Sequence, residues 1–227
     1  MPAAMLTLVD NFDSFVHTLA DYCRAAGAET RVVRNDAVGV EELRRADAVL
    51  LSPGPGRPEE AGVCVEAVRR LGDVPVLGVC LGHQAIAAAF GGTIIRVPPR
   101  HGRSSRVVRD GGRVLEGLPD AFEAARYHSL AAEEASLPGE LRVVARSEDG
   151  VVMAVEHIER PVFGVQFHPE SVLSEYGRTI VGNFLHLAGL IADRPPPQPT
   201  APGLNRPAAG DDFYARPADP RYPAPSA

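Results

Sequence analysis

Short apolar runs alternate with amphipathic or alanine-rich segments along the first 90 residues of the chain. A short apolar run is typical of a strand that is buried on both faces of a parallel sheet. The segments between the runs favour helix. This β-α order predicts a mostly parallel, doubly wound sheet flanked by helices. The predicted strands are residues 5–9, 30–34, 46–51 and 74–79, and the predicted helices are residues 15–26, 59–71 and 84–90.

The pattern changes after the pair Gly91-Gly92, where short strands and turns replace the β-α alternation. An apolar run at residues 162–167 predicts a further strand, and an amphipathic segment at residues 175–191 predicts a last helix. The expected fold class is α/β, with a mostly parallel sheet flanked by helices and an antiparallel extension. The strands of the extension are predicted at residues 93–97, 105–109, 141–145 and 151–157.

The composition divides the chain into two parts. Residues 1–192 carry the alternating pattern and are expected to form one domain. Residues 193–227 hold ten of the 21 prolines and little apolar sequence. Such a segment cannot bury enough apolar surface to offset the entropy lost on ordering. We therefore predict a Pro-rich, disordered C-terminal tail over residues 193–227.

Residues 78–82 read Gly-Val-Cys-Leu-Gly and join a predicted strand to a predicted helix. The pattern is a cysteine version of the G-x-S-x-G elbow, a sharp turn that lifts its central side chain out of the sheet. The helix N-terminus that follows Cys80 favours a thiolate there. The alternative is a buried structural cysteine. The framing glycines and the polar pair His83-Gln84 favour a nucleophile instead.

A nucleophilic cysteine needs a base, and the base needs a group that orients it. Of the seven histidines, His168 follows the predicted strand 162–167 directly and is itself followed by Pro169 and Glu170. In a shared parallel sheet, His168 lies at the same edge as Cys80. The Glu170 carboxylate is then near enough to fix the imidazole tautomer. An isolated His-Pro-Glu is as readily a plain loop, but together with the elbow it predicts a Cys-His-Glu triad.

Residues 52–58 form a loop rich in glycine and proline after the predicted strand 46–51. The prolines restrict φ, while Gly54 and Gly56 let backbone N–H groups approach a ligand. The alternative is an ordinary connection between strand and helix. The dinucleotide fingerprint G-x-G-x-x-G is absent from this loop.

Charge and composition exclude several classes of function. A formal net charge of −6 argues against a dedicated binder of nucleic acid or of acidic membranes. The absence of lysine from the sequence excludes a P-loop NTPase and a pyridoxal phosphate enzyme. We expect neither a transmembrane helix nor a signal peptide. Three cysteines without a C-x-x-C pair predict free thiols in the cytoplasm and no zinc site.

Taken together, the motifs resemble the class I, or triad, glutamine amidotransferases. Residues 78–84 (Gly-Val-Cys-Leu-Gly-His-Gln) and 167–171 (Phe-His-Pro-Glu-Ser) carry this resemblance, which covers roughly residues 5–190. It implies the flavodoxin-like fold of that family. Further motifs narrow the resemblance to the small glutaminase subunit of anthranilate synthase or aminodeoxychorismate synthase. They lie at residues 10–14, 34–36, 52–56, 101–102, 127–130 and 182–184.

The resemblance implies a reaction on L-glutamine. The Cys80 thiolate attacks the side-chain amide, His168 transfers protons, and Glu170 holds the imidazole. Water then hydrolyses the glutamyl thioester, and the ammonia passes to a separate chorismate-binding synthase subunit, which is the expected partner. Either the anthranilate or the aminodeoxychorismate pathway is compatible with these motifs.

The resemblance also implies the groups that bind glutamine. Backbone N–H groups of Leu81 and of the loop at 54–56 hold the oxyanion. Gln84 and the backbone of residues 129–130 bind the amino-acid end of the substrate. We expect no cofactor and no metal ion, and no nucleic acid or membrane as a partner. The predicted binding residues are Gly54, Pro55, Gly56, Leu81, Gln84, Ser129 and Leu130.

A stand-alone γ-glutamyl hydrolase or cysteine peptidase of the same fold is the alternative function. It also uses a Cys–His pair, but it does not need Gln84 or the 129–130 segment. A catalytically inactive binding subunit is disfavoured because all three triad positions are filled. One departure from the family is Arg103, where lysine usually follows His-Gly. Since the chain has no lysine anywhere, general replacement of lysine explains Arg103 more simply than an altered partner contact.

Overall fold

The computed structural model describes residues 4–199 of the chain. Its strands are β1 (Met5–Asp10), β2 (Glu29–Arg34), β3 (Ala48–Leu51), β4 (Val76–Val79), β5 (Ile94–Arg109), β6 (Ala121–Ala132), β7 (Leu141–Ser147), β8 (Val152–His157) and β9 (Val162–Val165). Its α-helices are α1 (Phe15–Ala25), α2 (Val40–Leu43), α3 (Cys64–Arg70), α4 (Leu81–Ala89) and α5 (Gly177–Leu187). Short 3-10 turns are η1 (Pro58–Glu60), η2 (Arg113–Leu115) and η3 (Glu134–Ser136).

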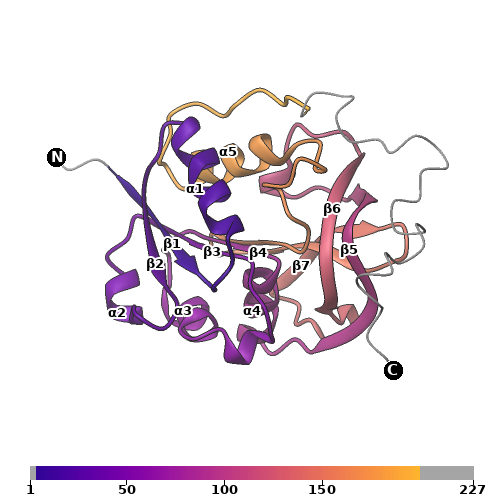
Figure 1. Ribbon diagram of the computed structural model, residues 1–227, viewed down its shortest axis with the longest axis horizontal. Helices are drawn as coiled ribbons and strands as arrows, with labels where there is room; N and C mark the ends of the chain where they lie inside the picture. Colours follow the sequence, from indigo (N-terminus) through magenta and orange to yellow (C-terminus); the bar gives the residue numbers. More distant parts are fainter. Residues whose placement is uncertain (1–3, 200–227) are drawn as a thin grey trace, which may run out of the picture.

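The strands form one mixed sheet in the order β2-β1-β3-β4-β9-β8-β7-β5-β6. Strands β2, β1, β3, β4 and β9 pair in parallel. Strands β8, β7, β5 and β6 continue the sheet with antiparallel pairs. The predicted α/β fold class is confirmed, and the antiparallel extension is as extensive as the parallel part. Figure 1 shows the β5–β6 pair at the end of the molecule away from β2.

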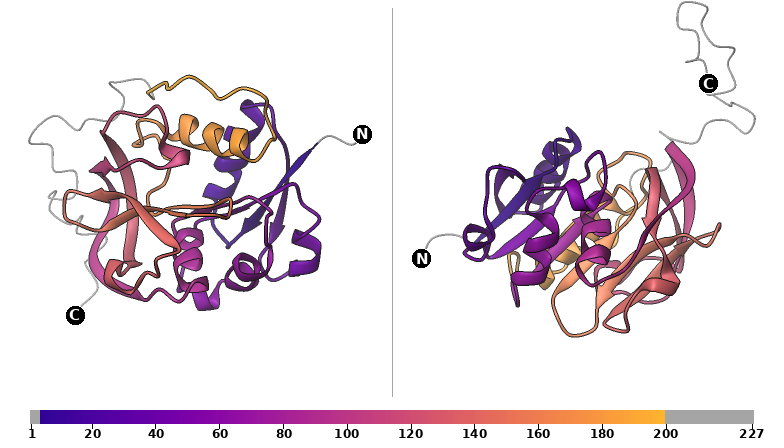
Figure 2. Two further views of the ribbon diagram at one scale, coloured as in Figure 1. Left: turned by 180° about the vertical axis from the view of Figure 1, so that it is seen from behind. Right: turned by 90° about the horizontal axis from the view of Figure 1, so that it is seen from below.

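Helices cover both faces of the parallel half. Helices α1 and α5 lie over one face, and α3 and α4 lie over the other, as the views in Figures 1 and 2 show. Alternate residues of β1 point to opposite faces. Leu6 and Leu8 therefore join the core beneath α1 and α5, while Val9 joins the core beneath α3 and α4. Strands β3, β4 and β9 are buried along their whole length, as their apolar runs predicted.

Strand β5 differs from the sequence prediction. The predicted strands 93–97 and 105–109 are the two ends of one strand of 16 residues. Prolines and a glycine in between favoured a break, because Pro cannot donate to a ladder. The strand continues through this segment because its register shifts twice, between Arg96 and Arg100 and between His101 and Arg103. Such irregularities bend a strand without ending it.

Two further differences concern strand β6 and the segment before α3. No strand was predicted over β6, since its alanines and buried charge hide the alternation typical of a strand. The predicted helix 59–71 is split into η1 and α3. Gly62 lies between the two with φ +53, and at this residue the backbone turns instead of continuing as a helix. The other predicted helices agree with α1, α4 and α5 to within a few residues.

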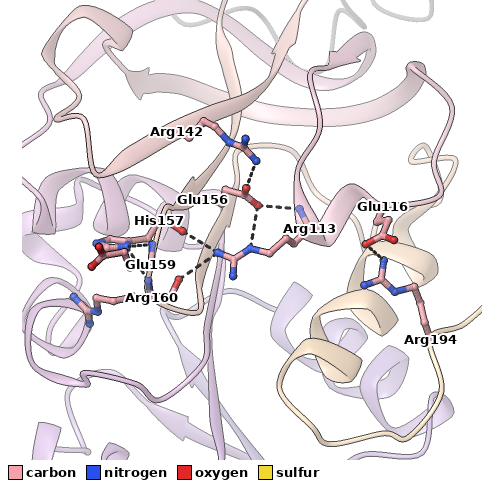
Figure 3. Close-up of polar contacts among 8 residues, drawn as sticks. All are labelled: Arg113, Glu116, Arg142, Glu156, His157, Glu159, Arg160 and Arg194. Atoms are coloured by element: carbon pink, nitrogen blue, oxygen red, sulfur yellow. Dashed lines mark hydrogen bonds and ion pairs between the residues drawn. The ribbon is translucent and has the colours of Figure 1, made fainter.

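A network of charged groups, drawn in Figure 3, joins β7, β8 and η2. The Glu156 carboxylate is almost fully buried and accepts hydrogen bonds from the Arg142 guanidinium and from the Arg113 backbone N–H at 2.8 Å. The Arg113 guanidinium donates to the carbonyl of His157 at 2.8 Å and lies over the ring of Phe163 at 4.6 Å. We call these groups the Glu156 network.

The first residues of the predicted tail lie against α5. The Arg194 guanidinium pairs with Glu116, and the backbone N–H of Gln198 donates to Thr179 Oγ1 at 3.1 Å. A Cβ at Gly182 would lie only 2.4 Å from Cγ of Pro195. The rest of the predicted tail, residues 200–227, lies outside the described residues, so its predicted disorder stays a prediction.

Candidate active site

Cys80 occupies the turn between β4 and α4 and has the unusual backbone angles φ 52 and ψ −99. The turn is tight enough to require its glycines. A Cβ at Gly78 would lie 2.4 Å from the carbonyl group of Gly82, and a Cβ at Gly82 would lie 2.3 Å from the carbonyl oxygen of Leu51. A strained residue held between packed elements is typical of a functional site. The sequence GVCLG therefore forms the predicted elbow.

His168 lies at the same edge of the sheet as Cys80. Strands β4 and β9 are parallel neighbours with Val79 opposite Val165, and both Cys80 and His168 follow the ends of their strands. The backbone N–H of His168 donates to the carbonyl of Ala125 in β6 at 3.0 Å. The imidazole Nδ1 lies 2.6 Å from Oε1 of Glu170.

The electrostatics of His168 favour its protonated form. Burial alone would lower the pKa of the imidazole, because it removes water from the charged ring. Interactions with the Cys80 side chain and with the Glu170 carboxylate outweigh this effect and raise the pKa of His168 to about 10. The imidazole therefore carries a proton at neutral pH. Both Cys80 and Glu170 stabilise its positive charge.

Two aromatic rings hold the imidazole in place. Phe15 at the start of α1 and Tyr127 of β6 meet it edge-on, with ring centroids 5.5 Å and 4.9 Å from that of His168. The two rings also contact each other, with centroids 5.7 Å apart. Phe15 was not predicted as part of the site, and Tyr127 was identified only within the motif at residues 127–130, because their contacts join segments that are far apart in the chain.

A cavity of about 200 Å³ opens beside Cys80. It is large enough for a small amino-acid side chain and contains both apolar and polar lining groups. All seven residues predicted to bind substrate line it. Its lining consists of Gly54, Pro55, Gly56, Cys80, Leu81, Gln84, His101, Tyr127, His128, Ser129 and Leu130.

Buried amide side chains fix the Gly/Pro loop that borders the cavity. Asn11 donates from its backbone N–H to Ser52 Oγ at 2.9 Å and from its side chain to the carbonyl of Ser52 at 2.8 Å. Asn35 donates to Oδ1 of Asn11 at 2.9 Å, and Cys64 Sγ lies 3.1 Å from the same oxygen. A Cβ at Gly54 would lie 2.5 Å from Cβ of Asn11. The loop is thus packed against the ends of β1 and β2.

Gln166 is a polar group of the site that sequence reasoning missed. It is fully buried, accepts from Gln84 Nε2 at 3.2 Å, and its own Nε2 lies 3.6 Å from Cys80 Sγ. A glutamine within the apolar run 162–167 was the available signal. It lies two residues before His168, directly after the end of β9.

His83 does not take part in the cavity. Its ring is fully buried against β9, where Gly164 leaves room for it; a Cβ there would lie 2.7 Å from His83 Nδ1. Burial lowers the pKa of His83 to about 4, so it is neutral at neutral pH. Of the polar pair predicted at the start of α4, only Gln84 faces the cavity.

The described residues contain neither a cluster arranged to bind a metal ion nor a helix that could span a membrane. Between residues 4 and 199, no group of three or more His, Cys, Asp or Glu is arranged to hold a metal ion. The same residues contain no helix that is long and apolar enough to cross a membrane.

The chain is similar in sequence to a known family and to several named proteins. A family model described as glutamine amidotransferase class-I matches residues 7–188. Anthranilate synthase component 2 of Azospirillum brasilense is 49% identical over 187 residues, covering 80% of this chain and 95% of the relative. The aminodeoxychorismate/anthranilate synthase component 2 of Bacillus subtilis strain 168 is 40% identical over 185 residues, covering 80% and 95%.

Longer relatives and solved structures match as well. The bifunctional protein TrpGD of Thermotoga maritima is 49% identical over 186 residues, which cover 79% of this chain but 32% of that relative. Among solved structures, a Thermoplasma acidophilum protein provisionally described as a GMP synthase subunit superposes with a TM-score of 0.75 at 27% identity. That alignment covers 83% of this chain and 96% of the other.

Proposed function

Because the chain belongs to the class-I glutamine amidotransferase family, we propose that Cys80, His168 and Glu170 hydrolyse L-glutamine and that the ammonia passes to a chorismate-using partner. The observation that carries the proposal is the pairing of a cysteine in a strained elbow with a buried histidine whose pKa is about 10. A thiolate and an imidazolium are the forms that this reaction needs at rest.

The first half of the reaction forms a thioester. Cys80 Sγ attacks the side-chain carbonyl carbon of glutamine, and the carbonyl electrons move to its oxygen. When the tetrahedral intermediate collapses, the C–N bond breaks and the imidazolium of His168 gives its proton to the departing nitrogen. Ammonia leaves, and His168 becomes neutral. The Glu170 carboxylate accepts a hydrogen bond from Nδ1–H, with Nδ1 2.6 Å from Oε1, and keeps the ring oriented.

The second half restores the resting state. Neutral His168 takes a proton from water as the water oxygen attacks the thioester carbonyl. Collapse of this intermediate breaks the C–S bond and releases glutamate, which leaves Cys80 as thiolate and His168 as imidazolium. No proton is gained or lost by the pair over the cycle.

Backbone N–H groups are proposed to hold the oxyanion in both halves. Leu81 begins α4, where the first N–H groups have no partner within the helix. The loop at 54–56 supplies the second donor, and the Asn11 contacts described above keep this loop in place. Loss of one such donor costs roughly 3 kcal/mol in the transition state.

Gln84 and the backbone of residues 129–130 are proposed to bind the amino-acid end of glutamine. Both border the cavity beside Cys80, and Gln84 Nε2 donates to the carbonyl of Leu130 at 2.9 Å. A polar wall in the same cavity as the nucleophile matches a substrate with a zwitterionic end and an amide end.

The proposed partner is a chorismate-binding synthase subunit that forms anthranilate or 4-amino-4-deoxychorismate. Support comes from relatives named component 2 of anthranilate and aminodeoxychorismate synthases. We also propose a cytoplasmic location, which the three free thiols Cys23, Cys64 and Cys80 support.

The test is to measure glutamate formation by the purified chain alone, with the synthase subunit, and with the subunit plus chorismate. Free ammonia release would waste glutamine, so we expect slow hydrolysis by the chain alone and faster hydrolysis after each addition. Full activity of the chain alone, unchanged by the additions, would contradict the partner-dependent function and favour a stand-alone hydrolase.

A further inference from the structure

One wall of the cavity lies where the β5–β6 ladder is irregular. Arg96 pairs with Leu130 and Arg100 pairs with His128, so residues 97–99 of β5 stand opposite the single residue Ser129. Regular ladder hydrogen bonds therefore do not fix the backbone at Ser129. Side chains must hold this part of the wall instead.

The carbonyl of Leu130 receives two side-chain hydrogen bonds. Gln84 Nε2 donates to it at 2.9 Å, and His128 Nδ1 lies 2.9 Å from the same oxygen. Gln84 comes from the elbow helix, and His128 is two residues before Leu130 on the same strand. Together these groups hold the carbonyl of Leu130, which borders the cavity.

Arg126 determines the tautomer of His128. Its Nε lies 3.0 Å from His128 Nε2, and guanidinium nitrogens only donate. Nε2 must therefore accept this hydrogen bond, so the ring proton is on Nδ1. Nδ1–H then donates to the carbonyl of Leu130. Burial, together with the charge of Arg126, lowers the pKa of His128 to about 3, so the ring stays neutral at neutral pH.

Asp149 in turn holds Arg126. The Arg126 side chain is 1% exposed, and its Nη1 lies 2.8 Å and 3.1 Å from the two carboxylate oxygens of Asp149. Arg100, on the other side of the irregularity, lies 3.5 Å from the same carboxylate. Arg126 is buried, whereas the Asp149 side chain is 30% exposed, and such an ion pair adds little net stability compared with apolar packing. The pair holds the Arg126 guanidinium against His128.

We propose that Asp149, Arg126 and His128 are positioning residues for glutamine binding, acting through the carbonyl of Leu130 on the backbone of residues 129–130. The inference rests on the glutaminase function proposed above and deepens it. Since these residues act on the amino-acid end of the substrate and not on the reacting bond, their loss raises KM for glutamine more than it lowers kcat.

Two substitutions of His128 separate positioning from packing. His128→Phe keeps a flat ring but removes both nitrogens, whereas His128→Asn keeps an N–H donor close to the position of Nδ1. In the complex with the synthase subunit, we expect His128→Phe to raise KM for glutamine by about tenfold and to change kcat by less than about threefold. His128→Asn should restore KM to within about threefold of the wild type. An unchanged KM for the Phe variant, or equal increases for both, would overturn the inference.

A matched pair of carboxylate variants tests the role of Asp149. Asp149→Asn and Glu134→Gln each remove one charge from an arginine–carboxylate pair, but the Glu134–Arg146 pair lies on the surface and neither of its residues lines the cavity. Only Asp149→Asn should raise KM for glutamine. Equal KM values for the two variants would contradict the positioning role.

Hydrogen exchange of the full chain without glutamine distinguishes this inference from the function on which it rests. Amides of residues 127–132 should exchange faster in His128→Phe than in the wild type and in His128→Asn. An inactive wild-type complex would contradict the glutaminase function. Unchanged exchange in an active enzyme would contradict the positioning inference alone.

Discussion

At the scale of single residues, the three cysteines have different surroundings. Burial raises the pKa of Cys23 and of Cys64 to about 12, so both stay protonated and unreactive at neutral pH. Cys80 lines the cavity and faces a protonated histidine. We expect iodoacetamide at neutral pH to alkylate Cys80 at least about ten times faster than the other two, as measured by mass spectrometry of peptides. Comparable rates at all three thiols would contradict the thiolate assignment of Cys80.

The two partners of Cys80 should differ in importance. His168→Ala removes the proton donor for the departing nitrogen, whereas Glu170→Gln leaves an imidazole that is present but less well held. We expect glutamine-dependent kcat to fall by roughly a thousandfold or more for His168→Ala and by a smaller factor for Glu170→Gln. Steady-state kinetics in the complex checks this order. A wild-type rate in either variant would remove that residue from the mechanism.

The pKa of His168 also predicts a pH dependence of stability. The folded chain raises this pKa from 6.5 to about 10, so the folded state binds the proton more tightly than the unfolded state. The resulting stabilisation is fully present below about pH 6.5 and is lost as the pH rises through about 10. Urea unfolding of the wild type and of His168→Asn should therefore show a difference in stability that shrinks over this range. A difference independent of pH would show that the raised pKa is wrong.

At the scale of secondary-structure elements, the central parallel strands β3, β4 and β9 were predictable because each is a short, fully buried apolar run. Sequence reasoning missed the short helix α2 and misjudged β5 and β6, two strands whose patterns depend on a neighbour. Strand β6 buries Arg126 against Asp149, so its inward face contains a charge where a strand pattern requires an apolar residue. Strand β5 passes two prolines by shifting its register, which local sequence does not encode.

Helix α5 allows a test of whether residues 193–199 contribute to stability. Alanine in place of a mid-helix glycine stabilises a helix by about 1 kcal/mol. At Gly182, however, the new Cβ would displace Pro195. We therefore expect Gly182→Ala to stabilise a chain that ends at Asp193 by about 1 kcal/mol and the full-length chain by less. Urea unfolding of the four variants provides the comparison, and equal gains in both chains would show that Pro195 does not contribute to stability.

At the scale of the whole molecule, the Glu156 network drawn in Figure 3 joins β7 and β8 to η2, and the Arg113 guanidinium also contacts β9 at the ring of Phe163. Glu156→Gln leaves two arginines without a buried countercharge, and we expect a loss of about 1–3 kcal/mol in the free energy of unfolding. The control Glu42→Gln, in an exposed pair with Arg31, should cost no more than about 1 kcal/mol. KM for glutamine should not change in either variant. Equal costs for both variants would contradict the structural role of the network.

Prediction of the site followed the same limits as prediction of the fold. The elbow and the His-Pro-Glu segment are local patterns, so their residues could be identified from the sequence. Phe15, Gln166 and the Asn11 contacts join segments that are far apart in the chain. Only the fold brings these segments together, so the motifs at 10–14 and 34–36 and the glutamine within the apolar run 162–167 did not reveal which groups would be in contact.

The central claim is that Cys80 produces ammonia and that a separate subunit consumes it. The most direct measurement compares product formation by the complex from glutamine and from added ammonium, with wild-type chain and with Cys80→Ser. The account predicts that Cys80→Ser abolishes the glutamine-dependent reaction and leaves the ammonium-dependent reaction at the wild-type rate. Glutamine-dependent product formation that survives in Cys80→Ser would contradict it.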